Sequence, residues 1–293
     1  MPARLRLAGI FKDPRHYQIL TLGCLLAFGW ASGAFEIASV QFLAIVTAAC
    51  AAQALGSFLI AVRPDFRSAI VTSLSLSLLL RADAVWPLAL AAILAIGSKF
   101  ALRINNKHIF NPANFAIVAM VLATDAAWTT PGQWGTAVWF AAALAGAGLF
   151  VTYRAARFDV PLIFLGVFAA LLFIRALWLG DPLSIPVLRL QNGALILFAF
   201  FMISDPKTTP DGSIARGLFA AGAAILTYVL IWHLFIADGL FYSLAIMCVL
   251  RPALEWADPA PHYRWGDPVR APPILKRLKA RRAPAQKFPA PAE

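Results

Sequence analysis

Residues 97–116 read GSKFALRINNKHIFNPANFA and place a basic, amide-rich segment between two apolar runs. We call this segment the polar island. It contains three cations, a histidine and four asparagines: Lys99, Arg103, Lys107, His108, Asn105, Asn106, Asn111 and Asn114. A bilayer offers no water to such groups, so polar residues at the ends of membrane helices usually have a partner or a function. The polar island is therefore the first candidate for a site.

The composition is that of an integral membrane protein. Of the 293 residues, 61% are hydrophobic and 13% are charged, and the mean hydropathy is +0.75. Soluble domains carry about 25% charged residues, so a soluble globular fold is excluded. The basic residues behind the net charge of +11 lie between apolar runs and in the tails, which favours membrane topology over a nucleic-acid partner. Cys24, Cys50 and Cys248 lie within apolar runs without metal-ligand spacing, so no metal site is predicted.

A membrane helix needs about 17–25 predominantly apolar residues, and by that measure we predict an all-α polytopic protein with about ten transmembrane helices. The predicted spans are 17–34, 37–62, 66–82, 84–102, 109–124, 133–153, 159–179, 190–204, 214–236 and 238–251. The third and eighth spans are short and have polar ends, so they are candidates for helices that are broken or that cross only part of the membrane. The first span could instead be a signal peptide, but its apolar run is long and more spans follow, which favours a retained helix.

The predicted spans divide the chain into three parts. A basic N-terminal tail at 1–16 precedes a transmembrane domain at 17–252, and a Pro-rich basic tail follows at 253–293. With the N-terminus in the cytoplasm, only Arg81, Arg175 and Arg189 of the 25 Lys and Arg residues fall on the other side. Cytoplasmic loops carry an excess of these residues, so this asymmetry predicts that both termini are cytoplasmic. The C-terminal tail is expected to contact anionic lipid headgroups or, alternatively, a partner subunit.

The predicted spans also divide into two halves of five, and an odd number per half inverts the second half. Under this division residues 78–87 (LLLRADAVWP) correspond to residues 201–210 (FMISDPKTTP). Each stretch has a short apolar run followed by an aspartate and a proline. Paired interrupted helices mark the central site of many membrane proteins built as inverted repeats. We therefore predict two five-helix inverted repeats.

A second polar motif, SDPKTTPDGSIAR at residues 204–216, lies on the same predicted membrane face as the polar island. An aspartate beside hydroxyl groups at a helix end can hold a cation or hydrogen-bond a heterocycle. In the island, Asn111-Pro112 interrupts a span, because proline lacks an amide hydrogen and disfavours helix before it. The alternative for both motifs is an ordinary loop whose asparagines and aspartates cap helices and turns.

The two motifs together are similar to those of a known family. Residues 98–116 (SKFALRINNKHIFNPANFA) resemble the signature SKxxx…KHIFNPAxFG of the NqrB/RnfD family, and residues 201–217 (FMISDPKTTPDGSIARG) resemble its segment FFMATDPVTSP…GR. These proteins are membrane subunits of the Na⁺-translocating NADH:quinone reductase and of the Rnf ferredoxin:NAD⁺ complex. The resemblance implies ten transmembrane helices in two related halves and flavin-linked electron transfer. It also implies a multi-subunit assembly that couples redox chemistry to Na⁺ or H⁺ movement.

One loop departs from the family pattern. Family members attach FMN to a threonine of an SGAT-type motif between spans seven and eight, and the matching loop here, residues 180–193, reads GDPLSIPVLRLQNG. Ser184 occupies the place of the family's serine, but the loop contains no threonine. Covalent FMN is therefore not expected. The departure suggests a divergent or stand-alone member that keeps a noncovalent flavin, riboflavin or FMN, or none.

We therefore predict a multi-pass subunit of the bacterial inner membrane that acts in electron transport, and is an enzyme only as a redox subunit of an oxidoreductase complex. Other membrane or peripheral redox subunits are the expected partners. The predicted cofactor-binding residues come from both motifs: Lys99, Arg103, Lys107, His108, Asn111, Asn114, Ser204, Asp205, Thr208 and Thr209. The basic residues are expected to stabilise a reduced, anionic flavin, and the amides and hydroxyls to bond its heteroatoms.

Two other functions remain open. The chain could be a transporter or channel-like protein, or a scaffold, that keeps the fold without the redox role. The absence of acidic residues from the middle of the spans argues against a proton or sodium path through this chain. Motifs of hydrolytic catalysis and of nucleotide binding (GxSxG, HExxH and Walker A) are absent from the sequence.

Overall fold

Each predicted span contains a helix in the structure. The computed structural model describes residues 13–33, 38–105, 107–130 and 137–265. The first half comprises α2 (Pro14–Ser32), α3 (Ser39–Leu59), α4 (Phe66–Leu79), α5 (Val85–Ala101) and α6 (Pro112–Ala123). The second half comprises α7 (Val138–Arg154), α8 (Asp159–Leu179), α10 (Gly193–Leu197), α11 (Ser213–Trp232) and α12 (Gly239–Ala257). The predicted all-α polytopic membrane fold is confirmed.

The helices differ in whether each alone is long enough to cross a bilayer. By length and composition, α3, α8, α11 and α12 each suffice, whereas α4, α5, α6 and α7 are apolar but shorter. A fifth candidate combines α9 (Ser184–Leu190), a helix that the sequence did not suggest, with α10 and its π-helical continuation η2 (Phe198–Met202). These two parts meet at an angle of 51°. The breaks expected in the third and eighth spans therefore correspond to the short α4 and to this bend.

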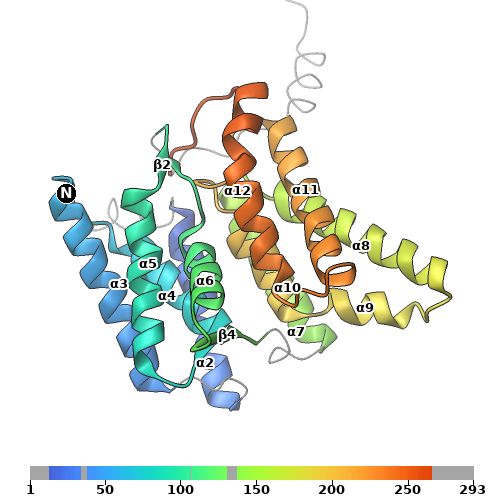
Figure 1. Ribbon diagram of the computed structural model, residues 1–293, viewed down its shortest axis with the longest axis horizontal. Helices are drawn as coiled ribbons and strands as arrows, with labels where there is room; N and C mark the ends of the chain where they lie inside the picture. Colours follow the sequence, from blue (N-terminus) through green and yellow to red (C-terminus); the bar gives the residue numbers. More distant parts are fainter. Residues whose placement is uncertain (1–12, 34–37, 106, 131–136, 266–293) are drawn as a thin grey trace, which may run out of the picture.

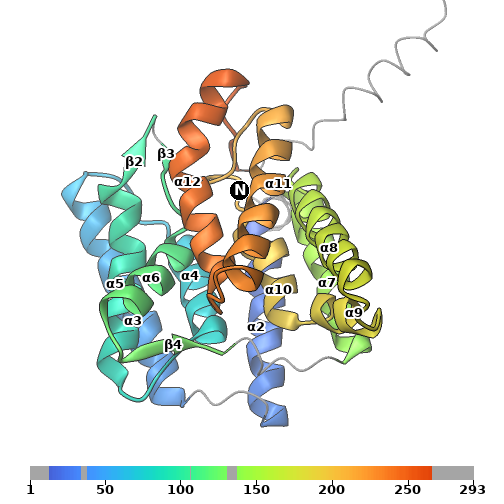
Figure 2. The ribbon, with the colours of Figure 1, turned by 45° about the vertical axis from the view of Figure 1, so that its right-hand side comes forward.

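The order of helix packing in the first half recurs in the second. In the first half α3 packs against α5 and α5 against α6, while in the second α8 packs against α11 and α11 against α12. Figure 1 shows α3 to α6 gathered beside a second group formed by α7 to α12. Contacts between α6 and α12 and between α2 and α7 join the halves, and Figure 2 shows α2 between the two groups. This packing supports two related halves, and their inversion remains a prediction.

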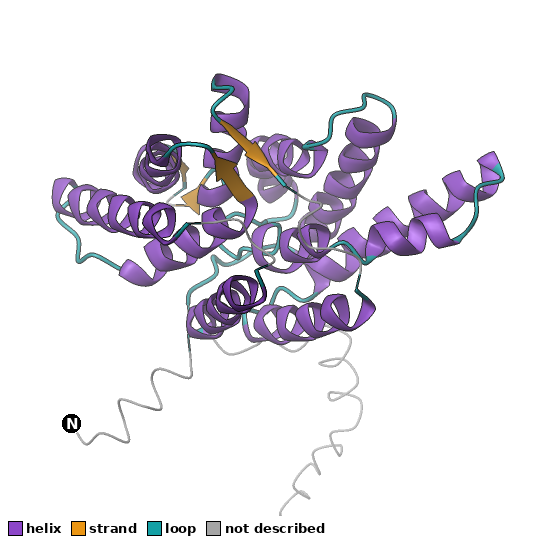
Figure 3. Ribbon diagram, turned by 90° about the horizontal axis from the view of Figure 1, so that it is seen from below, coloured by secondary structure: helices purple, strands orange, loops and turns teal. Residues whose placement is uncertain are grey.

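Two short antiparallel sheets connect the helices (Figure 3). Strand β1 (Leu80–Ala82) pairs with β4 (Ala127–Thr129), and β2 (Arg103–Ile104) pairs with β3 (Lys107–His108). The second pair is the middle of the polar island, so the island folds as a hairpin between α5 and α6. Asn111 caps the start of α6, and its side chain accepts a hydrogen bond from the Asn114 amide at 3.1 Å.

Folded structure continues beyond residue 252, the predicted end of the transmembrane domain. Helix α12 runs through Pro252 to Ala257. The following residues pack back onto the protein, since Lys207 Nζ donates to the Tyr263 carbonyl at 3.1 Å and the Arg15 guanidinium lies 4.6 Å from the centroid of the Trp265 ring. The first part of the predicted tail is therefore part of the fold.

Close packing of α7 on η2 depends on Gly148. A Cβ at this position would lie 2.5 Å from Cβ of Phe200, whereas no atom of the described residues lies within 4 Å of a Cβ built at Gly146 on the same helix. We expect Gly148→Ala to destabilise the protein by about 1–3 kcal/mol through overpacking. Gly146→Ala should be neutral or stabilising, because alanine favours helix over glycine by up to about 1 kcal/mol. Thermal unfolding in detergent measures both, and equal melting temperatures would contradict the packing.

Candidate functional site

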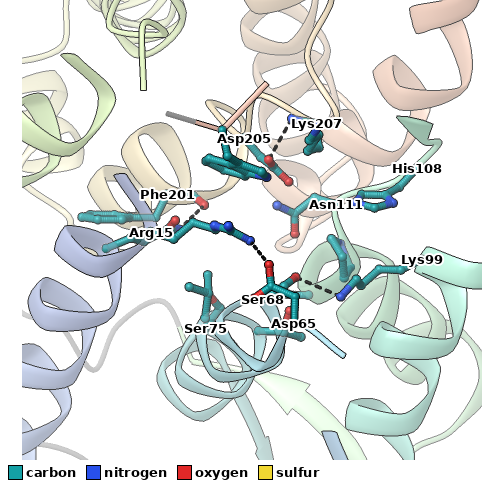
Figure 4. Close-up of a pocket in the computed structure, with 16 residues that line it drawn as sticks. Arg15, Asp65, Ser68, Ser75, Lys99, His108, Asn111, Phe201, Asp205 and Lys207 are labelled. Atoms are coloured by element: carbon teal, nitrogen blue, oxygen red, sulfur yellow. Dashed lines mark hydrogen bonds and ion pairs between the residues drawn. The ribbon is translucent and has the colours of Figure 1, made fainter. Parts of the chain in front are cut away.

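A cavity of about 230 Å³ lies where α2, α4 and α6 begin, next to the end of α5. Its walls hold polar side chains from both halves of the chain: Arg15, Gln18, Asp65, Ser68, Thr72, Ser75, Lys99, His108, Asn111, Asp205 and Lys207. The remaining wall is apolar and aromatic and includes Phe201 and Trp265. Figure 4 shows side chains from both halves pointing toward this space.

Three helices start at the cavity, and each has a side chain that caps its first turn. Asp13 accepts from the Arg15 amide at 3.0 Å at the start of α2, and Asp65 accepts from the Arg67 amide at 3.2 Å at the start of α4. Asn111 does the same for α6. The positive ends of the helix dipoles therefore meet here, and such ends favour negative charge.

Lys99 brings a buried positive charge from α5 to the cavity wall. Its Nζ donates to Gln53 Oε1 at 2.6 Å and to Ser68 Oγ at 3.0 Å. Both of these acceptors are neutral, and no carboxylate of the described residues forms an ion pair with the ammonium group. Lys99 therefore brings a positive charge to the cavity wall without a carboxylate in direct contact among the described residues, and this charge favours an anion in the cavity.

Arg15 is fixed in place by acidic partners. Its guanidinium contacts Asp13 at 2.6 Å and Asp65 at 2.6 Å, and Arg67 also contacts both acids. Burial alone would raise the pKa of Asp65, but hydrogen bonds from Arg67 and Arg15 and their charges lower it to about 2. This network is ionised at neutral pH and ties the start of α2 to the start of α4.

His108 presents a neutral ring to the cavity. Burial lowers its pKa to about 3, and the positive charges of Lys99 and Arg103 act in the same direction. Its Nδ1 is buried and has no hydrogen-bond partner among the described residues. Arg251, fully buried on α12, holds the histidine backbone by donating to its carbonyl at 3.1 Å. A neutral imidazole nitrogen of this kind is suited to accept a hydrogen bond from a ligand N–H.

Asp205 lines the other side of the cavity, at the end of η2. Burial raises the pKa of its carboxyl group, and the backbone hydrogen bond from Lys207 and the charges of Lys207 and Lys107 only partly oppose this. The Lys207 amide donates to Asp205 Oδ1 at 2.9 Å. The residue therefore belongs to a tight turn and also presents an ionisable oxygen to the cavity.

The predicted site residues divide between the cavity and its support. Lys99, His108, Asn111 and Asp205 line the cavity. The predicted residues that lie outside its wall are Arg103, Lys107, Asn114, Ser204, Thr208 and Thr209. Among these, Asn114 donates to the carbonyl of Phe241, Ser204 to that of Phe200, and Thr208 to that of Asp205. Arg103 is exposed on β2.

Lys107 and Thr209 belong to a buried cluster around Asp211, which we call the Asp211 clamp. Asp211 contacts Lys107 at 3.0 Å and Arg157 at 2.9 Å, and the side chains of all three residues are 5% exposed. Lys107 also donates to the Thr209 carbonyl at 2.9 Å and contacts Glu255 at 2.7 Å. The clamp joins the polar island to three other parts of the chain, namely the loop after α7, the second polar motif and α12. These contacts hold the hairpin that carries His108, which lines the cavity.

Sequence reasoning missed most of the cavity wall. The residues that it did not select are Arg15, Gln18, Asp65, Ser68, Val71, Thr72, Ser75, Pro112, Ala113, Phe201, Lys207 and Trp265. The sequence analysis used Arg15 and Arg67 only to predict the orientation in the membrane, although an aspartate between Arg63 and Arg67 in a predicted cytoplasmic loop is a usable signal for a site. Lys207 lies inside the second polar motif. Trp265 carries no sequence signal for a site.

We expect Asp211→Asn to lower the free energy of unfolding by about 3–5 kcal/mol, because it leaves Lys107 and Arg157 buried without this negative partner. The matched control is Asp181→Asn, which breaks a pair with Arg175 whose side chains are 34% and 35% exposed. Such an exposed pair contributes about 0–1 kcal/mol. Thermal unfolding in detergent compares the two variants, and similar melting temperatures would contradict the clamp.

His108 predicts a pH dependence of stability. Its pKa rises from about 3 in the folded protein to about 6.5 in the unfolded chain. Below about pH 6.5 the unfolded chain takes up a proton that the folded protein excludes, so the free energy of unfolding falls with a slope approaching about 1.4 kcal/mol per pH unit. His108→Gln should remove this loss between about pH 6.5 and 4. Equal acid sensitivity of the variant and the wild type would refute the assignment.

Comparison with known proteins identifies similarity in the second half of the chain. The family model described as the NQR2, RnfD, RnfE family matches residues 126–261. A subunit of the ion-translocating oxidoreductase complex of Escherichia coli O1:K1 / APEC is 29% identical over 124 residues, and its counterpart in Escherichia coli O81 (strain ED1a) is 28% identical over 124 residues. Each alignment covers 42% of this chain and 34% of the relative, so the chain matches about a third of the length of these proteins. The second polar motif lies within the region that the family model matches, and the polar island lies before it.

Proposed function

Because residues 126–261 match the model of the NQR2, RnfD, RnfE family, we propose that this chain is a membrane subunit of an ion-translocating electron-transport complex and that its cavity binds a noncovalent flavin. Under this proposal it lies in the bacterial inner membrane with both termini in the cytoplasm. Its partners are other membrane or peripheral redox subunits, and electron transfer in the assembly is coupled to ion movement.

The observation that carries the proposal is the meeting of the two polar motifs at one cavity. Asn111 of the polar island and Asp205 of the second polar motif both line it, and Asn111 Nδ2 donates to the Met202 carbonyl at 3.3 Å. The motifs come from different halves of the chain. A site assembled between related halves, at interrupted helices, is where membrane proteins of this architecture place their ligands.

The residues present fit a flavin ring. Its pyrimidine edge offers an N–H between two carbonyl oxygens, and the cavity wall offers the neutral ring of His108 as an acceptor with Lys99 and Asn111 as donors. The aromatic rings of Phe201 and Trp265 supply apolar wall. The cavity volume of about 230 Å³ is near the lower end of small-molecule pockets, about 300 Å³, so the space suits a single ring system rather than a dinucleotide.

Residues Lys99, His108, Asn111 and Asp205 would hold the flavin. A bound flavin supplies the ability to accept and donate electrons one or two at a time. The buried charge of Lys99 and the three helix starts favour a negatively charged ligand, and they therefore stabilise the reduced, anionic form of the cofactor more than the neutral form. The Asp205 carboxyl group provides an ionisable oxygen at the cavity wall.

The proposal does not include covalent attachment of FMN to the loop of residues 180–193. Ser184 is the first residue of α9, and no threonine is present in the loop. Any flavin of this chain should therefore appear in the supernatant after acid precipitation of the purified protein, whereas a covalently attached flavin stays in the pellet.

The direct test is the visible spectrum of the protein purified in detergent, alone and with co-expressed neighbouring subunits. We expect flavin absorbance, and we expect Lys99→Gln to weaken flavin binding by about tenfold or more, because it removes a buried charge facing the ligand. Arg103→Gln is the matched control, since it removes one positive charge from the same island at an exposed position outside the cavity. Absence of flavin under both conditions, or equal effects of the two variants, would overturn the proposed site.

A second candidate function is transport without electron transfer. It is favoured by the hydroxyl groups of Thr72 and Ser75, which continue the cavity along α4 into the bundle and are buried. Solute uptake into proteoliposomes in the absence of any electron donor would support this function, and uptake that depends on a donor would support the electron-transport subunit.

A further inference from the structure

We propose that residues 258–265, which we call the strap, cover the cavity and that Trp265 is a ligand-binding residue. The strap follows α12 and belongs to neither polar motif. Trp265 nevertheless lines the cavity together with Lys99, His108 and Asp205. The identity of the ligand rests on the proposed function, whereas the closure by the strap does not.

The strap is attached at its start to α11. The Asp258 carboxylate accepts hydrogen bonds from the amides of Ile214 at 2.9 Å and Ala215 at 3.0 Å, which lie in the first turn of that helix. Gly212 lies directly beneath, because a Cβ there would collide with both the carboxylate and the carbonyl oxygen of Asp258. The path of the strap as it leaves α12 is therefore set by the second polar motif.

The middle of the strap is held at Tyr263. Its amide donates to Asp211 at 3.3 Å and its carbonyl accepts from Lys207 Nζ at 3.1 Å. Its ring also faces the guanidinium of Arg157, with 4.9 Å between Cζ and the ring centroid. Two of these partners, Asp211 and Arg157, are members of the Asp211 clamp, so the strap is fastened to the same residues that position the His108 hairpin.

The end of the strap reaches across to α2. The guanidinium carbon of Arg15 lies 4.6 Å from the centroid of the Trp265 ring, within the range of a cation–π contact. Arg15 and Trp265 both line the cavity. The strap therefore bridges α12 and α2, and Trp265 is the strap residue that lines the cavity, to which it adds a flat aromatic side chain.

The strap is held less firmly than the other elements around the cavity. Between Asp258 and Tyr263 the chain has three exposed residues, Pro259, Pro261 and His262, whereas the other sides of the cavity are helices and the hairpin. Segments held by few buried contacts open at lower free energy than the elements around them. We infer that ligand enters and leaves by displacement of the strap, and that the Trp265 ring stacks on a planar aromatic ligand when the strap is closed.

The test of closure measures access to the cavity in the full-length protein. Ser75 lines the cavity and is 6% exposed, so Ser75→Cys reports access when Cys24, Cys50 and Cys248 are replaced by alanine. A small anionic methanethiosulfonate reagent, whose charge matches the preference of the cavity, should modify this cysteine about tenfold faster in Trp265→Ala, because the contact with Arg15 is lost. Trp265→Phe should stay close to the parent rate, because the aromatic face is retained.

The matched control is Trp256→Ala. Trp256 lies near the end of α12, is 87% exposed and lies outside the cavity wall, so its loss should leave the modification rate within about twofold of the parent. A Trp265→Ala rate equally close to the parent would overturn the closure. If Trp265→Ala fails to fold, Gly212→Ala replaces it, since the added methyl group displaces the strap at Asp258 and should also accelerate modification.

The rate at which a bound ligand dissociates tests the role of Trp265 in ligand binding. With riboflavin as the probe, dissociation from the detergent-purified protein should be about tenfold faster in Trp265→Ala than in Trp256→Ala. Unchanged dissociation would overturn the role of Trp265 as a ligand-binding residue. Failure of every variant and of the parent to bind riboflavin or FMN would overturn the proposed function, and the cysteine modification rates would still decide the closure.

Discussion

The ion pairs of Asp211 are the constraint on which the site depends. A carboxylate 5% exposed is placed between Lys107 and Arg157, and it also binds the amide of Tyr263. Burial would raise the pKa of Asp211, but the charge and hydrogen bond of Lys107, with His262 and Arg157, hold it below its usual value. These residues come from segments that are far apart in the sequence. They meet because a buried charge is tolerated only when its partners are present.

The cavity next to the Asp211 clamp has two chemical preferences for a ligand. Helix starts and Lys99 favour negative charge, whereas Phe201 and Trp265 favour an apolar, flat surface. The acids Asp13 and Asp65 form ion pairs with Arg15 and Arg67, and neither of them is in direct contact with Lys99. These two preferences are the basis for proposing a planar ligand that carries or acquires negative charge.

Much of the fold was accessible from composition and spacing, but only part of the site was. Apolar length located the helices of the two halves except α9, and the two polar motifs, expected to share a site, both reach one cavity. Four of the residues selected from the motifs line the cavity, while Lys107 and Thr209 proved to be members of the Asp211 clamp. A motif indicates which residues are needed, but it does not separate a residue that contacts a ligand from one that holds the contacting residue in place.

Hydropathy and helix-breaking residues are local properties, so the amino-acid sequence was sufficient to establish the membrane character, the positions of the helices and the two segments that carry polar chemistry. Which polar groups share a cavity depended instead on how the helices pack. Arg15 and Asp65 reach it because helices α2 and α4 begin side by side, and Trp265 reaches it because the strap folds back on the Asp211 clamp. These contacts join residues distant in the sequence, and no local pattern records them.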